Sequence, residues 1–193
     1  MKRSIRWPAP AKINLFLHVL GRREDGYHLL QTAFQFLDRC DWIDFEIFDQ
    51  PEIRRDRVIQ GVPENDDLVI RAAHTLKRVS EYAGGVSISV DKQLPIGSGL
   101  GGGSSDAATV LVALNELWGI NLSVDVLAEI ALSLGADVPV FVRGCAAWAQ
   151  GVGELLDPVE FDETPIVVVT PDCCVETKRV FESNDLTRDS VAI

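Results

Sequence analysis

The sequence of 193 residues has few basic residues, few cysteines and no long apolar run. Its 18 Lys and Arg residues are outnumbered by 29 Asp and Glu residues, which gives a net charge of −11. So acidic a chain lacks the basic surface that nucleic-acid binding requires, although a small nucleotide site can still be locally positive. No apolar stretch approaches the length of a membrane span. We therefore expect neither nucleic acid nor a membrane as a partner.

The four cysteines and three histidines form no pattern typical of a metal site or a redox motif. No two cysteines form a C-x-x-C pair, and the adjacent Cys173 and Cys174 are poorly placed to bridge each other. Reduced thiols are therefore the favoured interpretation, and we expect no metal ligands. Residues 1–10 contain charges and prolines but no apolar run, unlike a secretory signal. These features predict a cytoplasmic protein.

Apolar and polar residues alternate over residues 11–20, which predicts a strand with one apolar face. The same alternation places Lys12 and Asn14 side by side on the opposite face. Further strands are expected at residues 29–36, 43–48 and 86–90. Because a short polar turn at residues 21–26 separates the first two strands, the sheet should open as an antiparallel pair.

Three helices are expected after this opening. The first should begin at Asn65 or Asp66 and end near residue 82, the second should cover residues 107–118, and the third should run from Ser123 to Gly135. Short apolar stretches at residues 138–142 and 146–149 are interpreted as strands or buried loops, and residues 166–170 as a buried strand. This mixture predicts the α+β class.

A glycine-rich loop with the sequence LPIGSGLGGGSSD occupies residues 94–106, between an expected strand and an expected helix. Glycine permits positive φ angles, so that successive N–H groups can line a concavity that binds an anion. The loop leads into a helix N-terminus, whose dipole and free N–H groups also favour an anion. Ser104 and Ser105 can cap the helix or contact phosphate oxygens. The loop is therefore predicted to hold a phosphate.

Two better-known phosphate motifs fit this loop poorly. Gly97-x-Gly99-x-x-Gly102 matches the dinucleotide fingerprint by letter, but residues 91–96 separate the expected strand from the glycines. The preceding sheet is also expected to be antiparallel, and no second strand ending in an acid follows about 20 residues later. A Walker motif is excluded, because no Gly-Lys-Ser/Thr follows the loop. The loop alone thus indicates phosphate binding without specifying an enzyme.

Lys12 and Asp137 are the candidate reactive residues. Lys12 lies within an apolar strand, where an unpaired charge would be costly, so a carboxylate or phosphate partner is expected. Asp137 can be an ordinary turn residue, or a carboxylate at the rim of a pocket within reach of Lys12. In the second case it could accept the proton of an attacking hydroxyl, while Lys12 offsets charge on the transferring phosphoryl group. Asp106 would repel a phosphate, so it either acts through a metal ion or points away, and we favour the second.

These motifs resemble those of a known kinase superfamily. Residues 95–108 resemble the ATP-binding motif of galactokinase, homoserine kinase, mevalonate kinase and phosphomevalonate kinase, the GHMP kinases. Together with residues 10–17, 25–28 and 134–141, they are similar to the branch that acts on 4-diphosphocytidyl-2-C-methyl-D-erythritol in the non-mevalonate isoprenoid pathway. The resemblance implies transfer of a phosphoryl group from ATP, accompanied by Mg²⁺, to the 2-hydroxyl of that small-molecule substrate.

The resemblance also implies a role for each matching residue, as catalytic residue, substrate contact or ATP contact. Lys12 and Asp137 would be catalytic. Substrate binding is implied for Asn14, Tyr27, His28, Val152 and Thr177, and ATP binding for Asp67, Lys92, Pro95, Ile96, Gly97, Ser98, Gly99, Leu100, Gly101, Gly102, Gly103, Ser104 and Ser105.

The implied fold has two domains. An N-terminal ATP-binding domain, of the ribosomal-protein-S5-domain-2-like type with a mostly antiparallel sheet, is expected at residues 1–155, and the start of a C-terminal domain at residues 156–193. Family members run roughly 90 residues longer, so the C-terminal domain is expected to be largely missing. We expect a monomer or a homodimer. Two alternatives stay open, a nucleotide-binding fragment without catalysis and another small-molecule kinase of the same superfamily.

Overall fold

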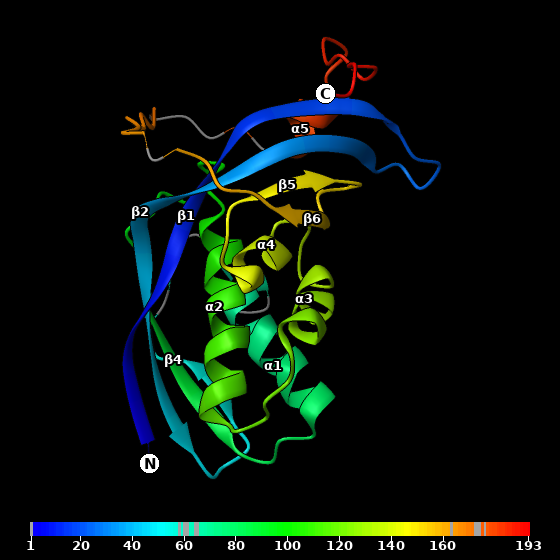
Figure 1. The fold of residues 1–193 in the computed structure, drawn as a ribbon. Helices are drawn as coiled ribbons and strands as arrows, with labels where there is room; N and C mark the ends of the chain where they lie inside the picture. The colour runs from blue at the N-terminus through cyan, green and yellow to red at the C-terminus, as the bar shows by residue number, and fades with distance from the viewer. Residues whose placement is uncertain are drawn as a thin grey trace.

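The structure, a computed structural model, describes residues 2–57, 59, 62–63, 66–162, 164–171, 175 and 177–193. The longest elements are two antiparallel strands, β1 (Lys2–Arg22) and β2 (His28–Phe48), which a short turn connects. This pair runs the length of the molecule (Figure 1). β2 pairs with β4 (Gly85–Asp91) through its second half and with β5 (Ala147–Gln150) through its first half. β3 (Ile53–Arg55) and β6 (Leu155–Pro158) complete the sheet, in the order β3-β4-β2-β5-β6.

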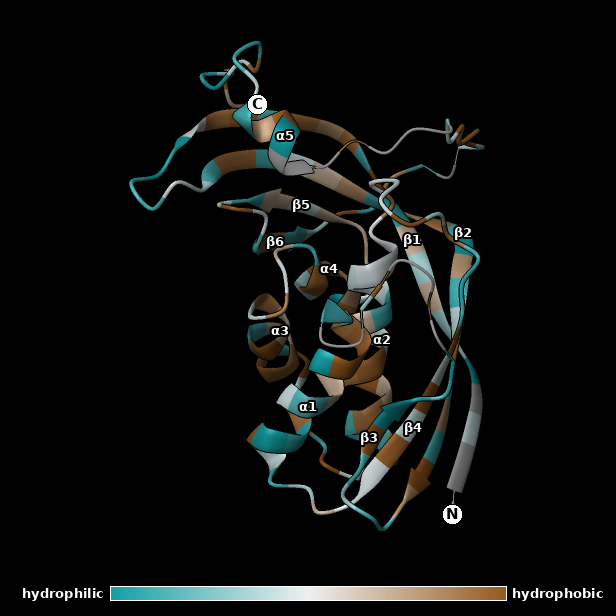
Figure 2. Ribbon diagram, turned by 180° about the vertical axis from the view of Figure 1, so that it is seen from behind, coloured by the Kyte–Doolittle hydropathy of each residue, from teal (hydrophilic) through white to brown (hydrophobic). Residues whose placement is uncertain are grey.

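Four helices pack together against one side of this sheet (Figure 1). They are α1 (Leu68–Ser80), α2 (Gly102–Leu117), α3 (Val124–Leu132) and α4 (Val138–Arg143). The central helix α2 is mostly apolar (Figure 2), and its buried Val110, Leu111 and Leu114 share one core with Phe45 and Ile88 of the sheet. A further short helix, α5 (Thr177–Glu182), lies beside the β1–β2 hairpin. The predicted α+β class is confirmed.

Most expected elements are present, with shifted boundaries. The two strands expected at residues 29–36 and 43–48 are parts of the single strand β2. Helix α1 is capped by Asp67, whose Oδ1 accepts the N–H of Val69 at 2.9 Å, and not by Asn65 or Asp66. Ser123 caps α3 as predicted, because its side chain accepts the N–H of Val126. Capping residues thus predicted the starts of these two helices to within one or two residues.

The interpretation of residues 138–142 as a strand or loop was wrong, because these residues form most of α4. Pro139 lies in the first turn of that helix, where its missing N–H is tolerated. Gly144 ends the helix with a φ of 68°, a left-handed conformation that suits glycine. Five apolar residues are too few to distinguish a buried helix from a strand by periodicity.

The buried strand expected at residues 166–170 is also absent. This segment has no regular structure, and Val167 is 89% exposed. A strand requires a neighbour that accepts and donates its backbone hydrogen bonds, and no described strand pairs with this segment. The predicted division between two domains at residue 155 stays a prediction. Among the described residues, no helix is long and apolar enough to cross a membrane.

Burial along β1 does not follow the alternation of apolar and polar residues that the sequence predicts. Leu15 on the expected apolar face is largely exposed, whereas Lys12 on the opposite face is only 5% exposed. Register shifts between Pro10 and Lys12 and between Asn14 and Leu17 interrupt the pairing with β2. Because each irregularity changes which side chains share a face, Leu17 lines the same pocket as Lys12 and Asn14.

Candidate active site

The structure brings Lys12 and Asp137 together, although 125 positions separate them in the printed sequence. Lys12 Nζ lies 3.2 Å from Asp137 Oδ2. Lys12 also donates a 2.7 Å hydrogen bond to Asn14 Oδ1 and lies over the ring of Phe34, 5.2 Å from its centroid. The ammonium is thus compensated, as expected for a charge inside a strand. The Asp137 side chain is about one-third exposed, so it can still meet a ligand.

Local structure explains the orientation of Asp137. It occupies the position that precedes α4, yet its carboxylate caps no N–H of that helix. The carboxylate is therefore free to face Lys12. Asn14 is fixed by a chain of hydrogen bonds, because its amide donates to Thr32 Oγ1 at 2.8 Å and Thr32 in turn donates to the carbonyl of Phe16. The lysine, the aspartate and the asparagine thus form one ordered group.

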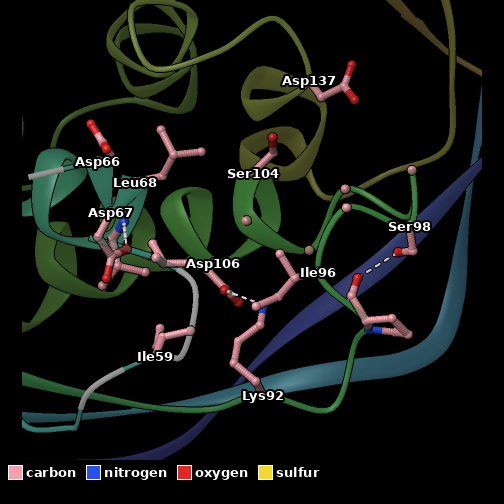
Figure 3. Close-up of a pocket in the computed structure, with 18 residues that line it drawn as sticks. Ile59, Asp66, Asp67, Leu68, Lys92, Ile96, Ser98, Ser104, Asp106 and Asp137 are labelled. Carbon is pink, nitrogen blue, oxygen red and sulfur yellow. Dashed lines mark hydrogen bonds and ion pairs between the residues drawn. The ribbon is translucent and has the colours of Figure 1, made fainter. Parts of the chain in front are cut away.

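The glycine loop lines a pocket of about 360 Å³ (Figure 3). Gly97, Gly99 and Gly101 all adopt left-handed φ angles, of 72°, 78° and 74°. Gly101 is the N-cap of α2, so the loop opens onto the free N–H groups of that helix. The conformation that the glycine content predicted is therefore present, and with it a concavity suited to an anion.

Most of the predicted ATP-binding residues line this pocket. Two do not. Leu100 contributes its carbonyl, which accepts the backbone N–H of Lys12 at 2.9 Å and so links the loop to β1. Ser105 is fully buried inside the first turn of α2. The predicted residues that do line the pocket are Asp67, Lys92, Pro95, Ile96, Gly97, Ser98, Gly99, Gly101, Gly102, Gly103 and Ser104.

Asp67 and Lys92 each have protein partners already. Asp67 caps α1 and forms an ion pair with Arg55 at 2.5 Å, with both side chains almost fully buried. Lys92 lies between Asp41 and Asp106, at 2.5 Å and 2.8 Å. Asp106 lines the pocket, so the expectation that it points away was wrong. Sequence reasoning missed Asp41, because nothing in its neighbourhood reveals that it lies beside the glycine loop.

The buried acid Asp106 has an unusual protonation equilibrium. Burial, and to a smaller extent the Asp41 carboxylate, raise its pKa to about 7 against the opposing effect of Lys92. For Lys92, burial lowers the pKa, but the interactions with Asp106 and Asp41 outweigh burial and leave the pKa above its ordinary value. Lys92 is therefore a cation at neutral pH, and Asp106 exchanges its proton in the neutral range.

A second and larger pocket, of about 1230 Å³, is lined by both Lys12 and Asp137. The predicted substrate residues Asn14, Tyr27, His28 and Val152 all line it. Tyr27 is largely exposed at its rim. Thr177 is the first residue of α5, but its side chain lies outside the described residues.

Sequence reasoning missed Phe181 and Arg188, which also line the second pocket. Phe181 stacks on the ring of His28, with centroids 4.9 Å apart. Arg188 donates hydrogen bonds to the carbonyls of Phe181 and Ser183, both at 2.8 Å, and so holds this segment together. Partial burial lowers the pKa of His28, and the cations Arg188 and Arg22 lower it further. His28 therefore meets a ligand as a neutral ring at neutral pH.

The two pockets meet. Gly99, Ser104 and Asp137 line both of them. A phosphate chain held in the first pocket could therefore end beside a hydroxyl held in the second, with Asp137 and Lys12 at the junction. This arrangement suits transfer of a phosphoryl group between two bound molecules.

The fold is that of the GHMP kinases. Residues 67–145 match the family model described as "GHMP kinases N terminal domain". The chain also superposes on a homoserine kinase from Cytophaga hutchinsonii, with a TM-score of 0.67 at 18% identity, over 97% of this chain and 62% of that one. At that identity the likeness concerns the fold alone. The predicted GHMP kinase fold is confirmed.

Within that superfamily, the chain is similar to 4-diphosphocytidyl-2-C-methyl-D-erythritol kinases. It is 57% identical over 183 residues to the one from Nitrosococcus oceani, and 55% identical over 188 residues to the one from Shewanella frigidimarina. These alignments cover 95% and 97% of this chain and 65% of each relative. A crystal structure of 4-(cytidine 5'-diphospho)-2C-methyl-D-erythritol kinase superposes with a TM-score of 0.81 at 41% identity, over 92% of this chain and 63% of that one.

The resemblance expected from the motifs is thus confirmed. The chain spans about 65% of the length of these curated relatives.

Proposed function

We propose that this chain carries the nucleotide site and the acceptor site of a small-molecule kinase, which transfers a phosphoryl group from ATP to the 2-hydroxyl of 4-diphosphocytidyl-2-C-methyl-D-erythritol. The observation that carries the proposal is the junction at Asp137, where an anion-binding glycine loop and a larger pocket share one carboxylate. The names of the relatives support the choice of acceptor. A cytoplasmic location remains a prediction.

The proposed chemistry follows from the position of Asp137. Its carboxylate would accept a hydrogen bond from the acceptor hydroxyl and take its proton as the oxygen attacks the terminal phosphorus of ATP, whose bond to the bridging oxygen breaks so that ADP leaves. The Lys12 ammonium, 3.2 Å away, orients the carboxylate and offsets negative charge on the transferring group. Asn14 fixes Lys12 in this position through its 2.7 Å hydrogen bond.

The glycine loop would supply the other half of the reaction. Its N–H groups and those that open α2 would bind the phosphate chain and set the direction of the terminal phosphate. Lys92 adds a cation to the same pocket. Binding both reactants at fixed positions converts a bimolecular encounter into a reaction within one complex, which is the main contribution that a phosphoryl transferase makes.

Magnesium is implied with ATP. Mg²⁺ at nucleotide sites is bound largely by phosphate oxygens and water, with one or two carboxylates at most. In the part of the chain that the structure describes, no group of three or more His, Cys, Asp or Glu residues could hold a metal ion. The described residues therefore offer no dedicated metal cage, and the ion would enter with the nucleotide to neutralise its phosphates.

The larger pocket would hold the rest of the acceptor. Tyr27 offers an exposed ring, and His28 and Val152 also line this pocket. A neutral imidazole can both donate and accept hydrogen bonds, which suits recognition of a pyrimidine base. Tyr27, His28, Val152 and Thr177 keep their implied role in substrate binding, with Tyr27 and His28 placed at the cytosine.

The test is ADP release from Mg-ATP in the presence of the cytidylyl substrate, for the wild type and for Asp137→Asn. The variant should lose about 100-fold or more in kcat, because a positioned general base contributes on the order of 10²–10⁴. Asp125→Asn is the matched control. It makes the same chemical change at an exposed acid that pairs with Arg143 and lines neither pocket, so it should leave turnover unchanged.

Three outcomes would replace the proposal. Full turnover by Asp137→Asn would remove Asp137 from the mechanism. ATP binding without turnover in the wild type would favour the nucleotide-binding fragment, an alternative motivated by the chain's 65% share of its relatives' length. A preference for homoserine or mevalonate over the cytidylyl substrate would favour another kinase of the superfamily.

A further inference from the structure

A buried cluster of one amine and two carboxylates lies beside the glycine loop. Lys92 Nζ is 2.5 Å from Asp41 Oδ2 and 2.8 Å from Asp106 Oδ2, and Figure 3 shows the second pair. Asp41 comes from β2, Lys92 from the segment after β4, and Asp106 from the second turn of α2. A Cβ placed on Gly102 would lie 3.4 Å from both Asp41 Oδ2 and Lys92 Nζ. The cluster thus adjoins the first residue of α2.

Asp41 fixes the backbone that leads into the loop. Its Oδ1 accepts the N–H groups of Gln93 at 2.5 Å and of Leu94 at 2.8 Å, while its Oδ2 pairs with Lys92. The fully buried carboxylate is therefore satisfied on both oxygens. In contrast, Asp106 is almost fully buried, and its Oδ1 has no hydrogen-bond partner among the residues that the structure describes. An unpaired buried oxygen of this kind is costly for a charged carboxylate and is a natural site for a proton.

Within the cluster, two carboxylates share one cation. Among the described residues that line the nucleotide pocket, Lys92 is the only basic one. Asp67 is neutralised by Arg55 and Asp137 by Lys12, but Asp41 and Asp106 share the single charge of Lys92. A bound phosphate chain would therefore face a cluster with a net charge of −1 when both carboxylates are ionised.

Two charged groups contact Asp106 or its partner Lys92, and two ion pairs lie nearby. Lys92 and Asp41 contact the cluster directly. The Asp67–Arg55 pair lies at the start of α1, and the Lys12–Asp137 pair lies on the β1 side of α2. Each of the last two is a closed ion pair, so neither supplies a net charge to Asp106. Burial and Asp41 raise the pKa of Asp106 to about 7 even against Lys92.

We propose that binding of the nucleotide's phosphate chain is coupled to uptake of one proton by Asp106, which brings the cluster from a net charge of −1 to neutral and frees Lys92 from its ion pair with Asp106, while Asp41 holds Lys92 and the entrance of the loop in place. The inference rests on the proposed nucleotide site and adds its regulation. In this scheme Asp41 is a positioning residue, because it acts through Lys92 and the backbone.

The direction of the pH effect follows from the charges. Phosphates beside Asp106 favour its neutral form, so the pKa of the bound state lies above that of the free protein. Protons are then taken up on binding between these two pKa values, that is, above about pH 7. Over that range, nucleotide affinity falls as pH rises, by at most about tenfold per pH unit from this group. At pH values well below 7 the contribution of Asp106 becomes flat.

The test is calorimetric titration of this chain with the non-hydrolysable analogue AMP-PNP at fixed free Mg²⁺, from pH 6 to pH 8.5, in buffers of different ionisation enthalpy. Wild type should take up more protons than Asp106→Asn, whose amide imitates the protonated acid. The variant should match the wild type at pH 6 and bind about threefold to tenfold more tightly at pH 8.5. Ionisation of the nucleotide itself is common to both proteins and cancels in the comparison.

Two further variants separate proton coupling from loss of structure. Asp41→Asn keeps an oxygen for Gln93 and Leu94 but removes the charge that raises the pKa of Asp106, so the window of proton uptake should move to lower pH. Asp66→Asn is the matched control. It removes an acid from the same pocket without touching the cluster, so it should keep the wild-type pH dependence.

Equal proton uptake by wild type and Asp106→Asn would overturn the inference while leaving the nucleotide site intact. Absence of AMP-PNP binding by the wild type would overturn both the inference and the proposed function. If Asp106→Asn does not fold, carbon-13 NMR of the Asp106 carboxyl decides. Its titration midpoint should rise when AMP-PNP saturates the wild type, and an unchanged or lowered midpoint would contradict the coupling.

Discussion

Replacing Gly101 with alanine should disturb the glycine loop and Lys12 together. Gly101 is the N-cap of α2 and has a φ of 74°. A Cβ at this position would lie 2.7 Å from Cζ of Phe141 and 3.2 Å from Cε of Lys12. Gly99 provides a matched control, because it has a similar φ of 78° but no atom within 4 Å of the added carbon. The two substitutions share the backbone strain and differ only in the clash.

Two effects contribute to the loss of stability, the backbone strain at both positions and the steric clash at Gly101 alone. A left-handed conformation costs an alanine about 1–2 kcal/mol, partly offset by about 0.4–1 kcal/mol from the less flexible unfolded chain. Gly99→Ala should therefore lower the free energy of unfolding by about 1 kcal/mol. Gly101→Ala should lower it by about a further 1–3 kcal/mol, which is the usual cost of forcing an extra carbon into a packed site.

Urea unfolding of the wild type and both variants measures this difference, and calorimetry with AMP-PNP gives the effect on the site. Gly101→Ala should also weaken nucleotide binding more than Gly99→Ala, because the phenylalanine or the lysine must move. Equal losses of stability for the two variants would show that the added carbon meets no obstacle. The close approach between α2, α4 and β1 would then be wrong.

Three other perturbations follow from the ion pairs. Arg55→Met leaves Asp67 buried without a counter-ion, so the free energy of unfolding should fall by about 3–5 kcal/mol in urea, and Asp67→Asn in the same chain should restore part of it. Lys12→Met should lower kcat by about 100-fold or more while AMP-PNP affinity changes only a few-fold, as steady-state kinetics and calorimetry would show. Between about pH 4 and pH 7, folded Asp106 binds its proton more tightly than the unfolded chain does, so wild-type stability should fall with rising pH relative to Asp106→Asn, measured by thermal unfolding at each pH.

Local patterns predicted the parts of the site that depend on local chemistry. The density of glycine at residues 97–103 predicted the left-handed φ angles just before α2, and Ser123 predicted the start of α3. Lys12 was expected to have a charged partner because an unpaired ammonium inside a strand is costly, and Asp137 is that partner.

Parts of the structure that depend on tertiary contacts were missed or misread. Asp41 and Asp106 meet at Lys92 only because β2 and α2 pack on either side of the loop, which no spacing in the sequence reveals. Leu17 faces the larger pocket because of an irregularity in β1, whereas alternation places it on the other face. The apolar segment at residues 166–170 resembles a buried strand in composition, yet pairing and not composition makes a strand.

The central claim is that one carboxylate serves two pockets, and a crystal structure with AMP-PNP and 4-diphosphocytidyl-2-C-methyl-D-erythritol bound together tests it most directly. The account predicts that the acceptor's 2-hydroxyl oxygen lies about 3–3.5 Å from the terminal phosphorus. It also predicts that an Asp137 oxygen lies within about 2.6–3.2 Å of that hydroxyl. A terminal phosphate directed away from Asp137, or an acceptor hydroxyl beyond its reach, would contradict the account.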